Sequence, residues 1–168
     1  AWKALQSLDA FWKSDMSRKI KTKIFRTAVE PVLLYGAETW TLKKADTRAL
    51  DGVYTRLLRR VFGISWKSHT PNSVLYGNIP PVTDTIKTRR LRFAGHVYRL
   101  QDQPAQQLLF WQPSYGHRYR GRPHKTFSDV LQEDTGLDPD KLRWLMSDRD
   151  KWREALSRNS FQISSGST

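Results

Sequence analysis

The sequence predicts an all-α fold, and three observations support this class. Apolar residues recur at three- and four-residue steps along most of the chain, as they do on one face of an α-helix. No stretch alternates apolar and polar residues in the way that a half-buried strand requires. Capping residues, glycines and prolines separate the periodic segments. Seven Trp, seven Phe and six Tyr in 168 residues supply the apolar volume of a core.

The first part of the chain contains three predicted helices. The first spans residues 2–12, and its apolar positions are Trp2, Leu5, Leu8 and Trp12. The second begins at the N-cap Ser17, is broken or kinked at Pro31 and continues to about Trp40. One of its faces carries Ile20, Ile24 and Ala28. The third has acids towards its start and arginines towards its end, as the helix dipole favours, and it stops at Gly63. Its predicted inward positions are Leu50, Val53, Leu57, Leu58 and Val61.

Two further helices follow. Thr70 is the expected N-cap of a short helix with Pro71 in its first turn, which ends near Tyr76. Thr83 or Asp84 then caps a longer helix to about Leu100. That helix has a predicted core stripe of Ile86, Phe93, Val97 and Leu100, and a cationic stripe of Arg89, Arg92, His96 and Arg99. Gly95 lies inside it, where glycine costs about 1 kcal/mol against alanine. Close approach of another helix or of a sugar-phosphate backbone would each explain this glycine.

Helical periodicity is lost between residues 102 and 125, a stretch rich in Gly, Pro, Arg and aromatic residues that predicts a linker. Three short helices are predicted after it. Thr126 caps the first, which Gly136 ends; Asp138-Pro139 opens the second, and Ser147-Asp148 opens the third. Trp40, Trp66, Trp144 and Trp152 are expected in the core.

The net charge of +13, from 29 Lys and Arg against 16 Asp and Glu, predicts a polyanionic partner. The basic residues form three stripes at helical spacing, while many acids concentrate after residue 132. Phosphate contacts require cations on a folded surface and no base-specific code. The expected phosphate-binding residues are Lys19, Lys23, Arg26, Arg56, Arg60, Arg89, Arg92, His96 and Arg99. Arg120 and Arg122, in an Arg-Gly-Arg-Pro segment, are added as minor-groove or linker contacts.

Other classes of function have less support in the sequence. The chain has no Cys, and its four His form no ligand set, so we expect no metal and no cofactor. No nucleophile-elbow, P-loop or dinucleotide-binding motif occurs, so no active site is expected. The longest apolar run, residues 32–37, is far below the roughly 20 residues of a membrane span. We therefore expect no membrane partner. The lack of Cys fits a reducing compartment, and we expect an intracellular ribonucleoprotein of the nucleus or cytoplasm. Because the chain begins without Met, we also expect it to be a piece of a longer one.

Five segments resemble one protein family. They are EPVLLYGAETWTL (30–42), LRRVFGISW (58–66), TRRLRFAGHVYRL (88–100), RGRPHKTFSDVLQED (120–134) and DRDKWREAL (148–156). In this order they resemble the C-terminal part of endonuclease–reverse transcriptases from non-LTR, LINE-type retrotransposons, close to the RTE-like clade. The (F/Y)xDD motif of the polymerase core does not occur in this chain. The Cys/His zinc knuckle of several related proteins is excluded by the lack of Cys.

The resemblance implies a thumb and post-thumb region that grips a template–primer duplex, element RNA or target DNA during target-primed reverse transcription. RNA, DNA or a hybrid, together with the rest of the parent enzyme, are then the expected partners. The implied organisation is a thumb-like bundle (1–68), additional helices (69–101), a basic linker (102–125), a small C-terminal helical unit (126–158) and a flexible tail (159–168). The alternative is a protein-docking module, which binds the polymerase core or a cellular partner.

Overall fold

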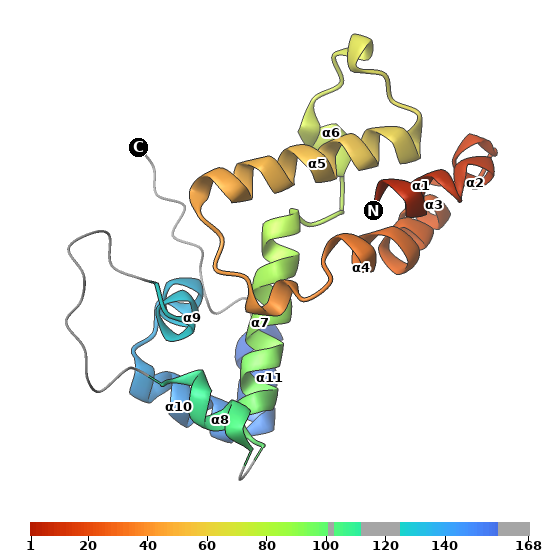
Figure 1. Cartoon of the computed structure of the whole chain (residues 1–168). Coiled ribbons are helices and arrows are strands. Elements are labelled where there is room, and N and C mark those ends of the chain that lie inside the picture. Colours follow the sequence, from red (N-terminus) through yellow and green to blue (C-terminus); the bar gives the residue numbers. More distant parts are fainter. Residues whose placement is uncertain (101–102, 112–124, 158–168) are drawn as a thin grey trace. The chain divides into compact units, whose positions relative to one another are not determined.

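The computed structural model describes residues 1–100, 103–111 and 125–157. Within these ranges all regular structure is helical, which confirms the all-α class. The chain divides into two compact units (Figure 1). Unit 1 comprises residues 1–37 and 42–86, and unit 2 comprises residues 38–41 and everything from Lys87 onward. The division falls within helix α7 (Val82–Tyr98).

Unit 1 begins with short helices where the sequence predicts longer ones. Its first elements are α1 (Trp2–Gln6), α2 (Asp9–Lys13), α3 (Arg18–Ile24), the π-helical turn η1 (Phe25–Val29) and α4 (Glu30–Leu33). The predicted first helix is interrupted at residues 7–8. The Ser17 cap is confirmed, because its side chain accepts from the backbone N–H of Ile20. The continuation to Trp40 is wrong: α4 ends at Leu33, and Gly36 at φ 67° turns the chain.

At the predicted break near Pro31 the helix contains a π-helical turn, η1, in place of a regular α-helical turn. Proline cannot donate to a carbonyl one turn earlier, and here η1 precedes it and Pro31 lies in the first turn of α4. The buried face of this segment also differs from the predicted one. Phe25 and Val29 are buried, whereas Ile20 of the predicted apolar face is half exposed.

Helix α5 (Lys44–Phe62) is the longest of the described helices and packs against α1, α2, α3 and α6 (Asn72–Tyr76). It ends at Gly63, in the left-handed conformation (φ 66°) expected of a glycine cap. Leu57, Leu58 and Val61 are buried as predicted, together with Tyr54. Helix α6 begins one residue later than Pro71, and the predicted Thr70 cap is wrong. The Thr70 carbonyl instead accepts from Arg59 at 2.7 Å.

A buried carboxylate lies among the apolar side chains of unit 1. Glu30 is 2% exposed, and its Oε2 accepts a 2.9 Å hydrogen bond from the Tyr54 hydroxyl. Arg26 lies 3.8 Å from the same oxygen and supplies the opposite charge. Burial and the neighbouring Glu30 raise the pKa of Tyr54 well above its ordinary value, so the hydroxyl stays a donor. Buried charge of this kind requires such partners.

Unit 2 contains the larger part of α7 and four further helices: α8 (Pro104–Leu109), α9 (Phe127–Thr135), α10 (Pro139–Ser147) and α11 (Arg149–Ser157). Helix α8 lies within the range predicted as a linker. The predicted caps after it are confirmed, since Thr126 and Asp129 form a reciprocal capping box and Asp138 accepts from two backbone N–H groups of α10. Gly136 ends α9 at φ 70°. Residues 101–102, 112–124 and 158–168, which include most of the predicted linker and all of the predicted tail, lie outside the described residues.

Helix α7 starts one residue before Thr83 and two before Asp84, its two predicted caps. Val82 is its first residue, and the backbone N–H groups of Asp84 and Thr85 bond to the Pro81 carbonyl. Its buried stripe also differs from the predicted one. Ile86 and Val97 are buried as expected, whereas Phe93 is 37% exposed. The other buried apolar positions on this helix are Val82, Leu91 and Ala94.

The core of unit 2 contains Leu91, Ala94, Val97, Leu109, Leu131, Leu142, Met146 and Trp152. Of the four tryptophans predicted in the core, Trp152 is buried and Trp40 is half-buried. The prediction is wrong for Trp66 and Trp144, which are mostly exposed. Trp152 packs on Gly95, where an added β-carbon would overlap its indole. Close approach of helix α11 therefore explains this glycine.

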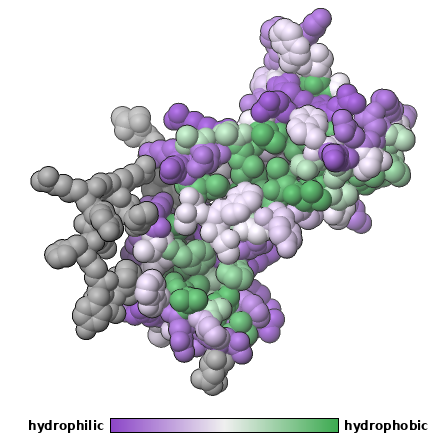
Figure 2. Space-filling model, viewed as in Figure 1, coloured by the Kyte–Doolittle hydropathy of each residue, from purple (hydrophilic) through white to green (hydrophobic). Residues whose placement is uncertain are grey.

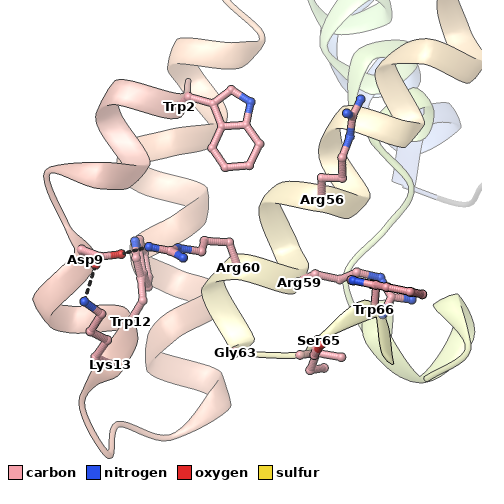
Figure 3. A pocket seen from close by; sticks show the side chains of 11 residues that line it. Trp2, Asp9, Trp12, Lys13, Arg56, Arg59, Arg60, Gly63, Ser65 and Trp66 are labelled. Carbon is pink, nitrogen blue, oxygen red and sulfur yellow. Dashed lines mark hydrogen bonds and ion pairs between the residues drawn. The ribbon is translucent and has the colours of Figure 1, made fainter. Parts of the chain in front are cut away.

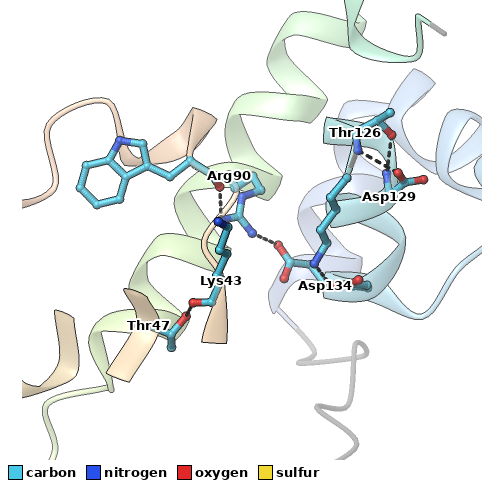
Figure 4. Close-up of polar contacts among 9 residues, drawn as sticks. Lys43, Thr47, Arg90, Thr126, Asp129 and Asp134 are labelled. Atoms are coloured by element: carbon cyan, nitrogen blue, oxygen red, sulfur yellow. Dashed lines mark hydrogen bonds and ion pairs between the residues drawn. The ribbon is translucent and has the colours of Figure 1, made fainter. Parts of the chain in front are cut away.

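Arg90 is buried in unit 2, although the sequence places it beside exposed arginines. Its Nη1 pairs with Asp134 at 2.5 Å and its Nη2 donates to the Trp40 carbonyl at 2.9 Å (Figure 4). The guanidinium therefore ties α7 to α9 and to residues 38–41 of the same unit. It contributes to the fold of unit 2 and leaves no accessible charge for a ligand.

Candidate nucleic-acid interface

A groove of about 670 Å³ opens on unit 1 between α1–α2 and the C-terminal end of α5 (Figure 3). Four of its lining side chains are cations and one is a carboxylate. Three tryptophans also line it. The described lining residues are Trp2, Asp9, Trp12, Lys13, Arg56, Arg59, Arg60, Gly63, Ile64, Ser65 and Trp66. Excess positive charge beside aromatic rings is the composition that nucleic-acid grooves use.

Asp9 holds two of these cations. Its carboxylate lies 2.7 Å from Lys13 Nζ and 2.9 Å from Arg60 Nη2, as the dashed lines in Figure 3 mark. The hydrogen bonds from Lys13 and Arg60 lower the pKa of Asp9, so the carboxylate stays ionised at neutral pH. A phosphate entering the groove would compete with this carboxylate for the same donors.

Arg56 and Arg59 are held differently. Arg56 is exposed, and its Nε donates to the carbonyl of Gly52 one turn earlier, which leaves the end of the guanidinium towards solvent. Arg59 is half-buried and bonds to the Thr70 carbonyl and to Asn72 Oδ1 at 3.2 Å. Arg56 is therefore available to a ligand, whereas Arg59 mainly positions the loop after α5.

That loop presents the most exposed tryptophan among the described residues. Trp66 is 73% exposed and Trp2, across the groove, is 46% exposed. Trp12, by contrast, is buried and donates to the carbonyl of Leu5 at 2.8 Å. A tryptophan normally buries most of its ring because of the apolar area that it removes from water. Exposed indoles on both sides of a cationic groove thus point to a ligand with flat faces.

The predicted binding residues of unit 1 fall into two groups. Arg56 and Arg60, one turn apart on α5, line the groove. Lys19 and Lys23 are exposed on α3, one turn apart, and are not among the groove's lining residues. Arg26 is exposed but pairs with the buried Glu30, so part of its charge serves the fold. The structure thus brings Arg56 and Arg60 together with Lys13, a cation that the sequence stripes did not include.

Three of the predicted binding residues of unit 2, Arg89, Arg92 and His96, lie on α7, and Arg99 follows directly after its end. Arg92 and His96 are exposed, one turn apart, and Arg89 is half-buried. Arg99 donates from Nη1 to the carbonyl of Met146 at 2.8 Å, which joins the turn after α7 to α10. Arg92 and His96 therefore remain the accessible part of this stripe. Arg120 and Arg122 lie outside the described residues.

Sequence reasoning missed Trp2, Lys13 and Trp66 as site residues. Trp66 was expected in the core and Trp2 was counted among the apolar positions of the first helix, because large apolar side chains most often pack inward. One signal was present for Trp66: it follows the helix-ending Gly63 by three residues and stands beside Ser65, Lys67 and Ser68 in a polar loop. Loops that carry large aromatic residues are frequent binding elements.

The described residues offer neither a metal site nor a membrane span. No group of three or more His, Asp or Glu side chains there is placed to hold a metal ion. None of the described helices combines the length and the apolar character needed to cross a membrane.

Fold and site together define an all-α, strongly basic protein with an aromatic, cationic groove. No family model matches the chain, and neither does any solved structure. The chain is 29% identical over 172 residues to a transposon-derived protein of Caenorhabditis elegans. That similarity covers 95% of this chain and 62% of the relative, so the chain spans less than two thirds of the relative's length. The chain is thus related to a protein of transposon origin.

Proposed function

We propose that this chain is a nucleic-acid-binding, non-catalytic part of a non-LTR retrotransposon reverse transcriptase. In this role it binds template–primer duplex, element RNA or target DNA during target-primed reverse transcription. The parent protein is then an RNA-directed DNA polymerase with an endonuclease, and the rest of that enzyme is the second partner. The cationic groove of unit 1 is the observation that carries the proposal.

Three features support this function. The groove joins Arg56, Arg60 and Lys13 from helices that are far apart in the sequence. The net charge of +13 attracts a polyanion from a distance. The relative is transposon-derived, which agrees with the transposon origin that the five resembling segments imply.

The experiment is a binding series with the intact chain at several salt concentrations. The probes are single-stranded RNA, an RNA hairpin, duplex DNA and an RNA–DNA hybrid. If phosphates dominate, log affinity should fall by about 0.9 per log of salt for each phosphate neutralised on B-DNA. Affinity that is equal at low and physiological salt would contradict the proposal.

A matched pair of variants on α5 locates the contact. Arg56→Gln should weaken binding and reduce the salt slope by about one phosphate equivalent. Arg48→Gln removes the same chemistry from an exposed position on the same helix that does not line the groove. It should leave the slope unchanged. Equal slopes for the two variants would place the binding surface elsewhere.

A docking module is the second candidate, and one observation favours it. Tyr35 is 86% exposed at the end of α4, and Val32 on that helix is half exposed. Figure 2 shows apolar surface (green) on unit 1 between hydrophilic regions. Removal of such area from water stabilises protein–protein contacts with little dependence on salt. The salt series therefore separates the two functions.

A further inference from the structure

The loop after α5 holds Trp66 in place by its own hydrogen bonds. Ser65 caps the 3-10 turn Trp66–Ser68, because its side chain accepts from the N–H of Lys67. Ser68 Oγ donates to the carbonyl of Ser65 at 2.6 Å and contacts Thr70 Oγ1 at 2.8 Å. These bonds fix the backbone of the loop from which the exposed indole of Trp66 projects.

The same loop contains a strained residue. His69 has φ 49°, and it is the one non-glycine residue with positive φ in the described part of the chain. This left-handed conformation costs about 1 kcal/mol or more outside glycine. Arg59 secures the next residue by donating to the Thr70 carbonyl. His69 is the C-cap of the 3-10 turn and its N–H bonds to the Trp66 carbonyl, so the backbone on both sides of Trp66 is fixed.

The charges around the loop favour an anionic partner. Lys67 and His69 are exposed on the loop itself, and Arg56 and Arg60 line the groove beside it. The lining carboxylate, Asp9, is already paired with two cations. A ligand for this site therefore needs flat apolar faces and negative charge within a few ångströms of each other.

Single-stranded nucleic acid meets this requirement better than a duplex. In a duplex the faces of each base are covered by its neighbours, so an indole can reach only the backbone or a helix end. Unpaired bases expose both faces, and a base in any nucleotide sequence can stack on an aromatic side chain. Their phosphates remain available to cations along the groove.

We propose that the groove of unit 1 binds a single strand of nucleic acid, with an unpaired base stacked on Trp66 and phosphates on Arg56 and Arg60. This inference rests on the proposed function and specifies which form of nucleic acid the site takes. Trp2 on the opposite wall provides a second indole for a neighbouring base. RNA and DNA share this chemistry, so the test includes both.

The test measures binding of the intact chain to a single-stranded oligonucleotide, as RNA and as DNA, and to the duplex of the same sequence. Trp66→Ala should weaken single-strand binding about tenfold and change duplex binding by less than about twofold. Trp66→Phe keeps an aromatic face and should retain most of the affinity. Trp144→Ala removes another exposed indole, from α10 in unit 2, and should leave affinity unchanged.

A fluorescent base analogue provides a direct signal. Emission of 2-aminopurine in the single strand should be quenched by the wild-type chain and recover with Trp66→Ala, because stacking is the cause of quenching. Binding with the same affinity and quenching in both would overturn the stacking proposal and leave the proposed function standing. Absence of binding to every probe would overturn the proposed function itself.

Discussion

The indole of Trp152 lies against Gly95, at a place where any β-carbon would overlap its ring. The indole Nε1 donates a 3.1 Å hydrogen bond to the carbonyl of Leu91, which lies on α7 with Gly95. The buried ring thus satisfies its polar atom while it fixes α11 on α7. The cost of a glycine inside a helix is offset by this close contact.

Gly95→Ala should therefore destabilise unit 2 by about 1–3 kcal/mol, because either the indole or helix α11 must move. Denaturant unfolding followed by tryptophan fluorescence measures the change. Gly52→Ala is the matched control, since a β-carbon at that position of α5 meets open space. It should stabilise by about 0.5–1 kcal/mol. A neutral or stabilising Gly95→Ala would show that the observed packing is not required.

Asp9→Asn should increase affinity for nucleic acid severalfold and steepen the salt dependence. The substitution removes the carboxylate that pairs with Lys13 and Arg60 in the groove, so both cations become available to phosphates. Titration of the variant and the wild type with one oligonucleotide at two salt concentrations checks this. Weaker binding would instead mean that Asp9 orients Arg60 for its ligand.

Substitution of two nearby arginines of α7 should have very different effects on stability. Arg90→Gln leaves Asp134 without its partner in a mostly buried site, so unfolding free energy should fall by about 3 kcal/mol. Arg92→Gln, on the exposed face two residues later, should change it by less than about 0.5 kcal/mol. Thermal unfolding of the two variants side by side provides the comparison, and similar losses would contradict the assignment of roles.

The α10 cap should make stability depend on pH. Backbone N–H groups, that of Lys141 first, lower the pKa of Asp138, so the native state favours the ionised carboxylate. Its contribution is complete above the ordinary Asp pKa and is lost as pH falls through the lowered one. The difference in melting temperature between wild type and Asp138→Ala should therefore shrink from about pH 5 to pH 2. A constant difference would exclude this cause.

Local signals in the sequence predicted the helix ends well. Ser17, Gly63, Thr126, Gly136 and Asp138 all lie at the termini for which they were predicted. Each of these caps involves groups within about three residues or the φ preference of glycine itself. Such interactions depend on the order of residues and very little on the rest of the fold.

Capping signals predicted the wrong first residue for the two helices that begin directly after a proline. Thr70 was the expected cap before α6 and Thr83 or Asp84 before α7, yet both helices begin directly after a proline. The preset φ of proline prepares the first turn, and carbonyls before it accept the first N–H groups. A polar side chain nearby then has no role as a cap.

The sequence by itself determined the helical class, the caps and the excess of positive charge, because these depend on composition and on neighbours along the chain. Only the tertiary structure decided which members of one residue type face inward. Trp152 is buried because Gly95 of another helix admits its ring, whereas Trp66 follows a helix end and stays in solvent. Arg90 is buried because Asp134, 44 residues away in the sequence, supplies its counter-charge, whereas Arg92 lies on the exposed face of the same helix. Periodicity gives the position of a residue around one helix and carries no information about which distant side chain meets it.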